Sequence, residues 1–193
     1  MGHKTKRLFI AVDIDETTRE QVGGISMGLH EAIGHTKVSW VRQDRIHLTL
    51  HFFGSAAAAL EARVRDTLAR ANAGPPFDVS FEGLGFYPQR GSPRVLWLGV
   101  GAGVEQLRRL QRALVIRGEG SAIPSHTDGS FNPHLTLARF RDRVPRAKVS
   151  EIADIRASAG PARIDRVTLY ESRLSPAGPT YVPLAEALLI PSG

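Results

Sequence analysis

Residues 47–50 of the chain read HLTL, and residues 134–137 repeat the same four letters. The two copies lie in the apolar stretches RIHLTLHFF and PHLTLA, whose alternation of polar and apolar side chains predicts two β-strands. Successive side chains of a strand point to opposite faces of its sheet. His47 and Thr49 are therefore expected on one face of the sheet, opposite the two leucines of their motif. His134 and Thr136 are expected to share a face in the same way.

The pattern around the motifs predicts a duplicated α+β unit, because each HLTL strand is followed by a helix. Besides the two motif strands, the first of which ends at Gly54, the predicted strands cover residues 8–14, 37–41, 77–86, 94–100, 163–170 and 180–184. The predicted helices cover residues 16–33, 55–72, 104–114 and 145–157, and residues 118–132 are expected to form a long loop. Two similar sheets facing each other would set the two imidazoles across one cleft.

The composition bounds the class of protein. A chain of 193 residues fits one domain, or two small lobes that share a core. The net charge of +6 favours anionic partners, nucleic acid above all. The absence of cysteine excludes disulfides and cysteine-based metal sites or nucleophiles. No apolar run is long enough to span a membrane and no signal-peptide stretch opens the chain, so the cytoplasm is the expected compartment.

The side chains of the two motifs suit acid–base chemistry on a phosphate ester. An imidazole has an ordinary pKa of about 6.5, so it gives or takes a proton near neutrality. His47 and His134 on opposite sides of a substrate would supply one general acid and one general base. The hydroxyls of Thr49 and Thr136 would donate hydrogen bonds to negatively charged oxygens. Phosphoryl transfer needs these parts, and a strained cyclic phosphodiester needs mainly a proton on its leaving oxygen.

Two other interpretations of the histidines compete with this one. A single histidine in a strand is more often a packed or surface residue, and threonine is a common strand former; the repetition of the whole tetrapeptide argues against that interpretation. His47 and His51 share a face, which is compatible with a metal site. Catalytic zinc usually takes at least three protein ligands, however, and no carboxylate lies near either motif at ligand spacing, so no metal is expected.

The paired motif and its surroundings resemble a known family, the 2H phosphoesterases, which are named for two His-x-Thr-x motifs. The similar stretches are residues 7–11 (RLFIA), 40–41 (WV), 47–54 (HLTLHFFG), 83–88 (GLGFYP), 94–99 (RVLWLG), 133–139 (PHLTLAR), 169–172 (LYES) and 178–181 (GPTY). They run over nearly the whole chain. The branch that the chain resembles most is that of the RNA 2′,3′-cyclic phosphodiesterases, also called 2′-5′ RNA ligases.

The resemblance implies a bilobal α+β fold, with two antiparallel sheets facing a central cleft and helices on the outer faces, in one domain over residues 1–193. It implies hydrolysis of RNA 2′,3′-cyclic phosphate ends to 2′-phosphomonoesters without a metal or another cofactor. His47 would then protonate the leaving 3′ oxygen and His134 would activate water, while Thr49 and Thr136 would hold the non-bridging oxygens. Some members also join or split 2′-5′ linkages, which the sequence leaves open.

Two positions next to the motifs need separate treatment. Arg139 matches a position that often carries Arg in this branch, where it is expected near the phosphate. Strict alternation would turn Arg139 to the leucine face, so the strand must end or bulge before it, or Arg139 must reach round from the strand end; a plain surface Arg is the competing interpretation. His51 stands where the branch commonly has Lys. It shares a face with His47 and Thr49 by alternation, so it is expected to line the cleft.

The expected partner is RNA with a 2′,3′-cyclic phosphate end, such as a tRNA fragment, and the chain is expected to act as a monomer. Aromatic residues that could stack on a base are Phe9, Trp40, Phe53 and Tyr87, for which core packing is the favoured interpretation. The basic residues Arg42, Arg45, Arg90 and Arg94 are expected at the rims, and His3 and His126 receive no role. Two alternatives stay open, namely a phosphodiesterase for a small cyclic nucleotide or a nucleotide-sugar cyclic phosphate, and a non-catalytic RNA-end binding module.

Overall fold

The structure is a computed structural model, and it describes residues 5–71, 73–114 and 131–190. The elements in chain order are β1 (Lys6–Asp13), α1 (Glu16–Ile33), β2 (Val38–Trp40), a 3-10 turn η1 (Gln43–Arg45), β3 (His47–Ala56), α2 (Ala58–Arg70), β4 (Phe77–Tyr87), β5 (Val95–Val100), α3 (Val104–Ala113), β6 (His134–Phe140), α4 (Arg146–Ala153), β7 (Ser158–Ile164), β8 (Arg166–Ser175) and β9 (Gly178–Leu188).

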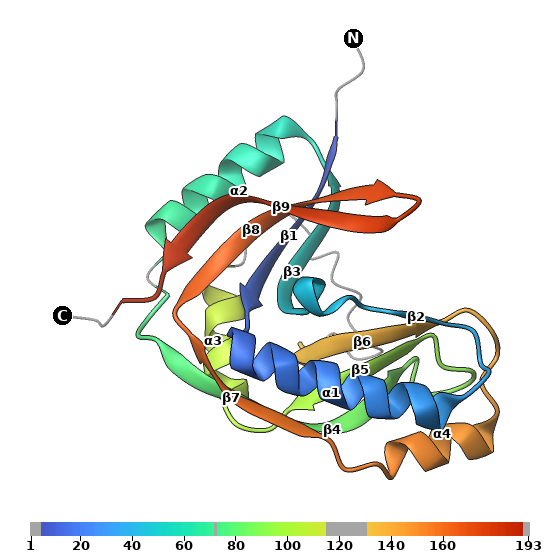
Figure 1. The fold of residues 1–193 in the computed structure, drawn as a ribbon. Helices are drawn as coiled ribbons and strands as arrows, with labels where there is room; N and C mark the ends of the chain where they lie inside the picture. The colour runs from blue at the N-terminus through green and yellow to red at the C-terminus, as the bar shows by residue number, and fades with distance from the viewer. Residues whose placement is uncertain (1–4, 72, 115–130, 191–193) are drawn as a thin grey trace.

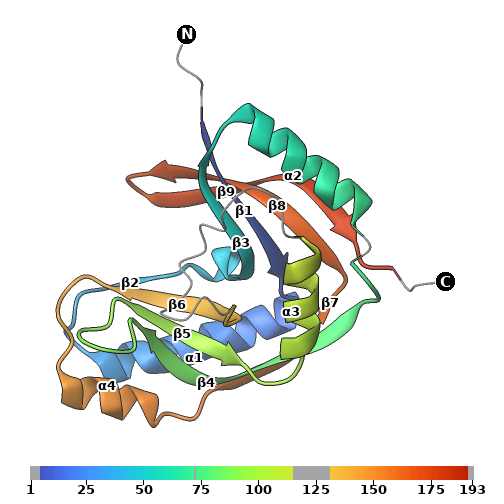
Figure 2. The same ribbon diagram turned by 180° about the vertical axis from the view of Figure 1, so that it is seen from behind.

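The nine strands of the described residues form one sheet in the order β7-β4-β5-β6-β3-β1-β8-β9, with β2 added on β6. Every neighbouring pair is antiparallel. Figure 1 shows β3, β1, β8 and β9 in its upper half and β6, β5, β4 and β7 in its lower half, and Figure 2 shows the same two groups from behind. The two motif strands, β3 and β6, therefore meet at the middle of the sheet.

This topology confirms the α+β class and the antiparallel strands, but it joins the two sheets that the sequence predicts as separate. β3 and β6 pair at Leu48 and Leu135, the second residue of each motif. Each half alone would end in a motif strand with unpaired backbone N–H and C=O groups, and pairing the two strands satisfies part of that edge. The division into two lobes about a central cleft stays a prediction.

The leucines of both motifs are buried in one hydrophobic core together with the helices. Leu48 is 1% exposed and Leu135 is 0% exposed. The same core takes in side chains from all four described helices, namely Val22, Leu29, Ile33, Val64, Leu68, Leu107, Leu110 and Ile152. The helices thus cover the leucine face of the motif strands, as expected. We call the opposite face of β3 and β6, which carries the histidines and threonines of the motifs, the motif face.

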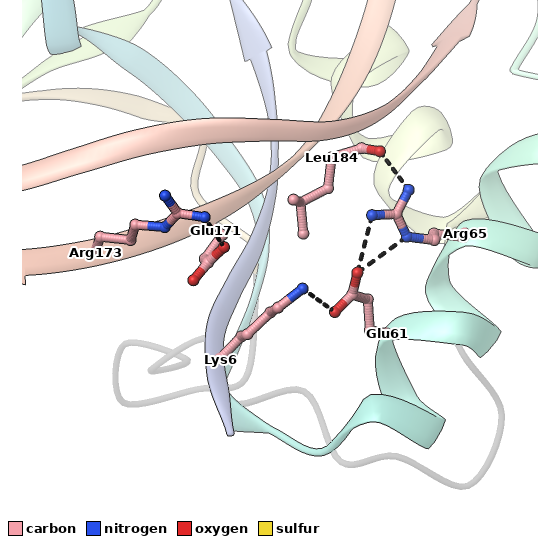
Figure 3. Close-up of polar contacts among 6 residues, drawn as sticks. All are labelled: Lys6, Glu61, Arg65, Glu171, Arg173 and Leu184. Atoms are coloured by element: carbon pink, nitrogen blue, oxygen red, sulfur yellow. Dashed lines mark hydrogen bonds and ion pairs between the residues drawn. The ribbon is translucent and has the colours of Figure 1, made fainter. Parts of the chain in front are cut away.

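An ion-pair cluster ties α2 to the inner strand β1 and to the edge strand β9 (Figure 3). Glu61 on α2 accepts a hydrogen bond from Lys6 Nζ of β1 at 2.8 Å and another from Arg65 Nη2 at 2.9 Å. Arg65 also donates to the backbone carbonyl of Leu184 in β9. The Glu61 side chain is only 14% exposed, and this burial raises the pKa of its carboxyl, but the two cations outweigh burial and hold that pKa below the usual range, Lys6 contributing most.

The boundaries of several elements differ from the sequence predictions. β7 was not predicted as a strand of its own, because Ser158–Ile164 reads SAGPARI and small residues, Gly and Pro are poor strand formers. It lies at the edge of the sheet, where Pro is tolerated. α2 begins at Ala58 rather than residue 55, because β3 runs past Gly54 and still pairs with β1 at Ala56.

Some expectations fall on residues that the structure does not describe. Most of the long loop predicted over residues 118–132 lies there, and so do His3 and His126. Within the described ranges, no helix is both long and apolar enough to cross a membrane.

Candidate active site

The polar residues of the two motifs lie side by side on the motif face. β3 and β6 are antiparallel and pair at the first leucine of each motif. Continuing that register by one position to either side places His47 beside Thr136 and Thr49 beside His134. All four side chains are partly exposed. Ideal sheet spacings would put the Cα atoms of the two diagonal histidines about 8 Å apart.

The imidazole of His47 is oriented by a backbone carbonyl. Its Nδ1 lies 2.8 Å from the carbonyl oxygen of Arg45, and its Nε2 lies 3.1 Å from Thr49 Oγ1. A carbonyl only accepts, so we assign the hydrogen to Nδ1, which donates it. Nε2 is then the nitrogen that takes up or releases a proton on the motif face.

The second histidine is held by the same device. Nδ1 of His134 lies 2.8 Å from the carbonyl oxygen of Asn132, again two residues before the histidine. The side-chain amide of Asn132 in turn donates to Tyr87 Oη at 2.8 Å, and the Tyr87 ring lies edge-on to the imidazole with centroids 5.2 Å apart. Both motifs therefore direct an Nε2 atom away from the backbone.

Aromatic side chains pack around each imidazole. Phe9 stacks on His47 with ring centroids 4.9 Å apart, and Tyr181 meets the same ring edge-on at 5.1 Å. Trp97 lies 5.7 Å from His134. The packing expected for the aromatic candidates is confirmed for Phe9 and Tyr87, which are 3% and 5% exposed, and for Phe53, which lies in the core. Phe9 and Tyr87 support the histidines rather than stand open to a base.

The electrostatic surroundings of His47 contain charges of both signs. Burial is the largest influence and lowers the pKa of His47, while the hydrogen bond to the Arg45 carbonyl and the charge of Asp13 raise that pKa and the charge of Arg139 lowers it further. Burial raises the pKa of Tyr181, against the charges of Arg139 and Arg45. Arg139 therefore lies close enough to act on both His47 and Tyr181.

A β-bulge resolves the position of Arg139. Thr136 and Ala138 pair with consecutive residues of β5, so Leu137 is an extra residue in β6. The bulge reverses the alternation after Leu137, because Ala138 is buried and Arg139 is exposed. Arg139 thus follows the side of His134 and Thr136, which is one of the two arrangements that the sequence allowed.

The same bulge in the first motif makes the prediction for His51 wrong. Thr49 and His51 pair with consecutive residues of β1, so Leu50 is the extra residue in β3. His51 consequently turns to the leucine face, where it is 2% exposed, and Phe52 takes the place on the motif face. Neither ring nitrogen of His51 has a hydrogen-bond partner, and burial lowers the pKa of this imidazole.

The structure therefore brings together five of the six predicted site residues and moves one away. Sequence reasoning missed Asp13, Asn132 and Tyr181 around the two imidazoles. Asp13 carried a signal, because it ends the otherwise apolar strand LFIAVD; Tyr181 lies in one of the stretches that resemble the family. Across the described ranges, no group of three or more His, Cys, Asp and Glu side chains is arranged to hold a metal ion.

The comparisons with known proteins define the class. The sequence profile of the 2′-5′ RNA ligase superfamily matches residues 28–175, a range that includes both motifs. The chain belongs to this superfamily, which confirms the resemblance seen in the sequence.

Individual relatives are similar over almost the whole chain. The RNA 2′,3′-cyclic phosphodiesterase of Archaeoglobus fulgidus is 36% identical over 91% of this chain and 96% of the relative. The protein of the same name from Thermotoga maritima is 33% identical over 93% of this chain and 94% of the relative. Among solved structures, TT0787 of Thermus thermophilus has a TM-score of 0.79 at 27% identity and covers 97% of this chain and 100% of its own. E. coli LigT in its apo form has a TM-score of 0.70 at 27% identity, with 96% and 98% coverage.

Proposed function

We propose that this protein hydrolyses 2′,3′-cyclic phosphodiester ends of RNA to 2′-phosphomonoesters by paired-histidine acid–base catalysis. The observation that carries the proposal is the pairing of the two motif strands, with each Nδ1 on a carbonyl and each Nε2 directed away from the backbone. The names of the A. fulgidus and T. maritima relatives support the same reaction. The net charge of +6 agrees with a polyanionic substrate.

In this mechanism Nε2 of His134 takes a proton from a water molecule as that water attacks phosphorus. The bond between phosphorus and the 3′ oxygen breaks, and protonated His47 gives its Nε2 proton to that oxygen, so the product carries a 3′ hydroxyl and a 2′ phosphate. The hydroxyls of Thr49 and Thr136 donate to the non-bridging oxygens, and Arg139 offsets the developing negative charge. Proton exchange with solvent then restores both imidazoles.

Several expectations about partners belong to this proposal. The substrate is RNA with a 2′,3′-cyclic phosphate end, including tRNA fragments, and the protein acts as a cytoplasmic monomer without a metal or another cofactor. Joining of 2′-5′ RNA linkages would use the same groups, with an RNA hydroxyl in place of water.

The test is a turnover assay on a short RNA that ends in a 2′,3′-cyclic phosphate, in the presence of EDTA. Chromatography against 2′- and 3′-phosphate standards identifies the product. We expect the 2′-phosphate, with a loss of about 10²–10⁴-fold in kcat for His47→Ala and for His134→Ala. His35→Ala, which changes an exposed histidine of the α1–β2 turn, serves as the control and keeps full activity.

A 3′-phosphate product, or full activity in either motif variant, would refute the mechanism. Binding of the RNA end without any turnover would favour the RNA-end binding module. Turnover of a cyclic mononucleotide that equals turnover of the RNA, without dependence on salt, would favour the small-nucleotide enzyme, since contacts to RNA phosphates are sensitive to salt.

A further inference from the structure

Asp13 lies at the cross-strand position directly opposite His47. It is the last residue of β1, and the β1–β3 register pairs it with the first residue of the HLTL motif. Side chains of directly opposed residues in an antiparallel pair share a face, with Cβ atoms about 4.5–5.5 Å apart. The carboxylate of Asp13 therefore stands beside the His47 imidazole on the motif face.

A partly buried hydrogen bond fixes this carboxylate. The hydroxyl of Tyr170 in β8 donates to Asp13 Oδ2 at 2.6 Å. The Tyr170 ring stacks on Phe9 with centroids 5.3 Å apart, and Phe9 stacks on His47. Burial, and next the hydrogen bond to Asp13, raise the pKa of Tyr170 far above its ordinary value, so the phenol keeps its proton and remains a donor.

The other groups that face His47 do not supply a negative charge. β6 contributes the guanidinium of Arg139, β9 contributes the Tyr181 ring, and the residues just before the imidazole contribute the carbonyl of Arg45. Burial and Arg139 both favour the neutral imidazole. The hydrogen bond to the Arg45 carbonyl and, next, the negative charge of Asp13 oppose them.

The second motif differs at the matching position. The β5–β6 register places Gly99 opposite His134, where the first half of the sheet has Asp13. A Cβ atom on Gly99 would lie 2.9 Å from the backbone oxygen of Glu82, a contact too close for any side chain. The directly opposite cross-strand position therefore carries a carboxylate at His47 and a glycine at His134.

We propose that Asp13, oriented by Tyr170, is the positioning residue whose charge favours the protonated form of His47 against burial and Arg139, and so suits His47 to act as the acid. The proposal rests on the paired-histidine hydrolysis proposed above and adds the group that suits His47 to the role of the acid. Asp13 acts through His47 and does not touch the substrate.

The test measures the pKa of His47 directly, by an NMR titration of the imidazole signals of the intact protein without substrate. The variants are Asp13→Asn, which removes the charge at nearly constant shape, Asp13→Glu, which keeps the charge, and Tyr170→Phe, which removes the orienting hydrogen bond. Asp44→Asn is the control, because this carboxylate is also near the motif in sequence but is exposed and paired with Arg42.

We expect Asp13→Asn to lower the pKa of His47 by about one unit, the lower end of what a close charge does. The basic limb of the pH profile of kcat/KM moves down by the same amount, so activity on that limb falls about tenfold. In Asp13→Glu, which keeps the charge, the pKa of His47 stays close to that of the wild type. Tyr170→Phe lowers the pKa of His47 by a smaller amount than Asp13→Asn does, and Asp44→Asn does not change it.

An unchanged pKa of His47 in folded Asp13→Asn overturns the proposal, whether or not the protein turns over RNA. A shift confined to the acidic limb of the rate profile overturns the assignment of His47 as the acid. If Asp13→Asn does not fold, Tyr170→Phe decides: a lowered pKa of His47 supports the proposal, and an unchanged or raised one overturns it. Failure of the wild type to hydrolyse the cyclic phosphate refutes the proposed function alone, because the titration needs no turnover.

Discussion

Replacement of His51 by Leu is expected to stabilise the protein and to remove part of its sensitivity to acid. His51 is 2% exposed, and both of its ring nitrogens lack a hydrogen-bond partner. Its neighbours are apolar, because its ring lies 4.4 Å from the ring of Phe53 and its cross-strand partner is the fully buried Ile10. A buried imidazole in such a place costs free energy of folding in two ways, one at neutral pH and one in acid.

At neutral pH, each buried polar group without a partner costs about 1–3 kcal/mol of folding free energy. Against this gain, imperfect packing of a leucine in the space shaped for an imidazole destabilises the variant by up to about 1.5 kcal/mol. The two ring nitrogens together cost about 2–6 kcal/mol, so the net gain for His51→Leu at pH 7.5 is at least about 0.5 kcal/mol, which raises the Tm of a chain of this size by about 1 °C or more.

In acid, the lowered pKa of His51 adds a second cost. The unfolded chain binds a proton near the ordinary histidine pKa of about 6.5, and the folded protein does so only at lower pH, so stability falls as the pH drops through 6.5. If the imidazole stays neutral in the folded protein, the free energy of unfolding falls by about 1.4 kcal/mol between pH 7.5 and pH 5.5. His47, whose pKa is also lowered, makes its contribution in both proteins and cancels in the comparison.

Urea unfolding followed by the fluorescence of the two tryptophans measures both effects, at pH 7.5 and at pH 5.5. His35→Leu is the matched control, since it makes the same replacement at a histidine that is exposed rather than buried. The reasoning fails if wild type and His51→Leu lose the same stability between the two pH values. It also fails if His51→Leu is the less stable protein at pH 7.5, because the ring would then make favourable contacts that the structure does not contain.

Three further outcomes are expected. Arg139→Gln lowers kcat/KM for RNA ends about 10–100-fold. The slope of the logarithm of affinity against the logarithm of salt concentration becomes shallower by about 0.7, the value for one phosphate contact to single-stranded nucleic acid. Steady-state kinetics at several salt concentrations measure both effects. Thr136→Val keeps the shape of the side chain but loses one donor, so kcat falls about 10²-fold while the thermal midpoint changes little. Glu61→Gln lowers the free energy of unfolding by about 1–2 kcal/mol at pH 7, because the partly exposed Lys6 and Arg65 lose their anion. The lowered pKa of Glu61 means that its contribution is present above the ordinary value of 4.5 and is lost as the pH falls below it, so urea unfolding in acid finds the Glu61→Gln defect gone.

Local periodicity predicted the parts of this fold that depend on near neighbours. Alternation in the two motifs separates the buried leucines from the partly exposed histidines and threonines, as the structure confirms. The spacing of Leu107 and Leu110 predicted α3, whose bounds lie within the expected range. These features follow from burial of one side of a single element, so the sequence of that element is enough to reveal them.

The features that the sequence did not reveal depend on pairing between distant strands. Leu50 and Leu137 stand where strict alternation already expects an apolar residue, so nothing in the sequence marks either one as the extra residue of a bulge. Strict alternation therefore predicts the wrong face for His51. For Arg139 it leaves two possibilities, a bulge or strand end before it, or a side chain that reaches round from the strand end. The contact of β3 with β6 is equally hidden, because identical motifs can pair with each other or face each other across a gap.

The bulges also show where the two halves of the sheet, one around each HLTL motif, differ from each other. Each bulge turns the residue two places further on to the motif face, and these residues are Phe52 in the first half and Arg139 in the second. The cross-strand partners of the two histidines differ as well, Asp13 in one half and Gly99 in the other. Hydrolysis by two imidazoles needs one to arrive protonated and the other neutral, which two equivalent environments cannot supply. A charge-bearing side chain at position 99 would begin with a Cβ only 2.9 Å from a backbone oxygen, so exchange of the two roles needs movement of β4 and not merely a substitution.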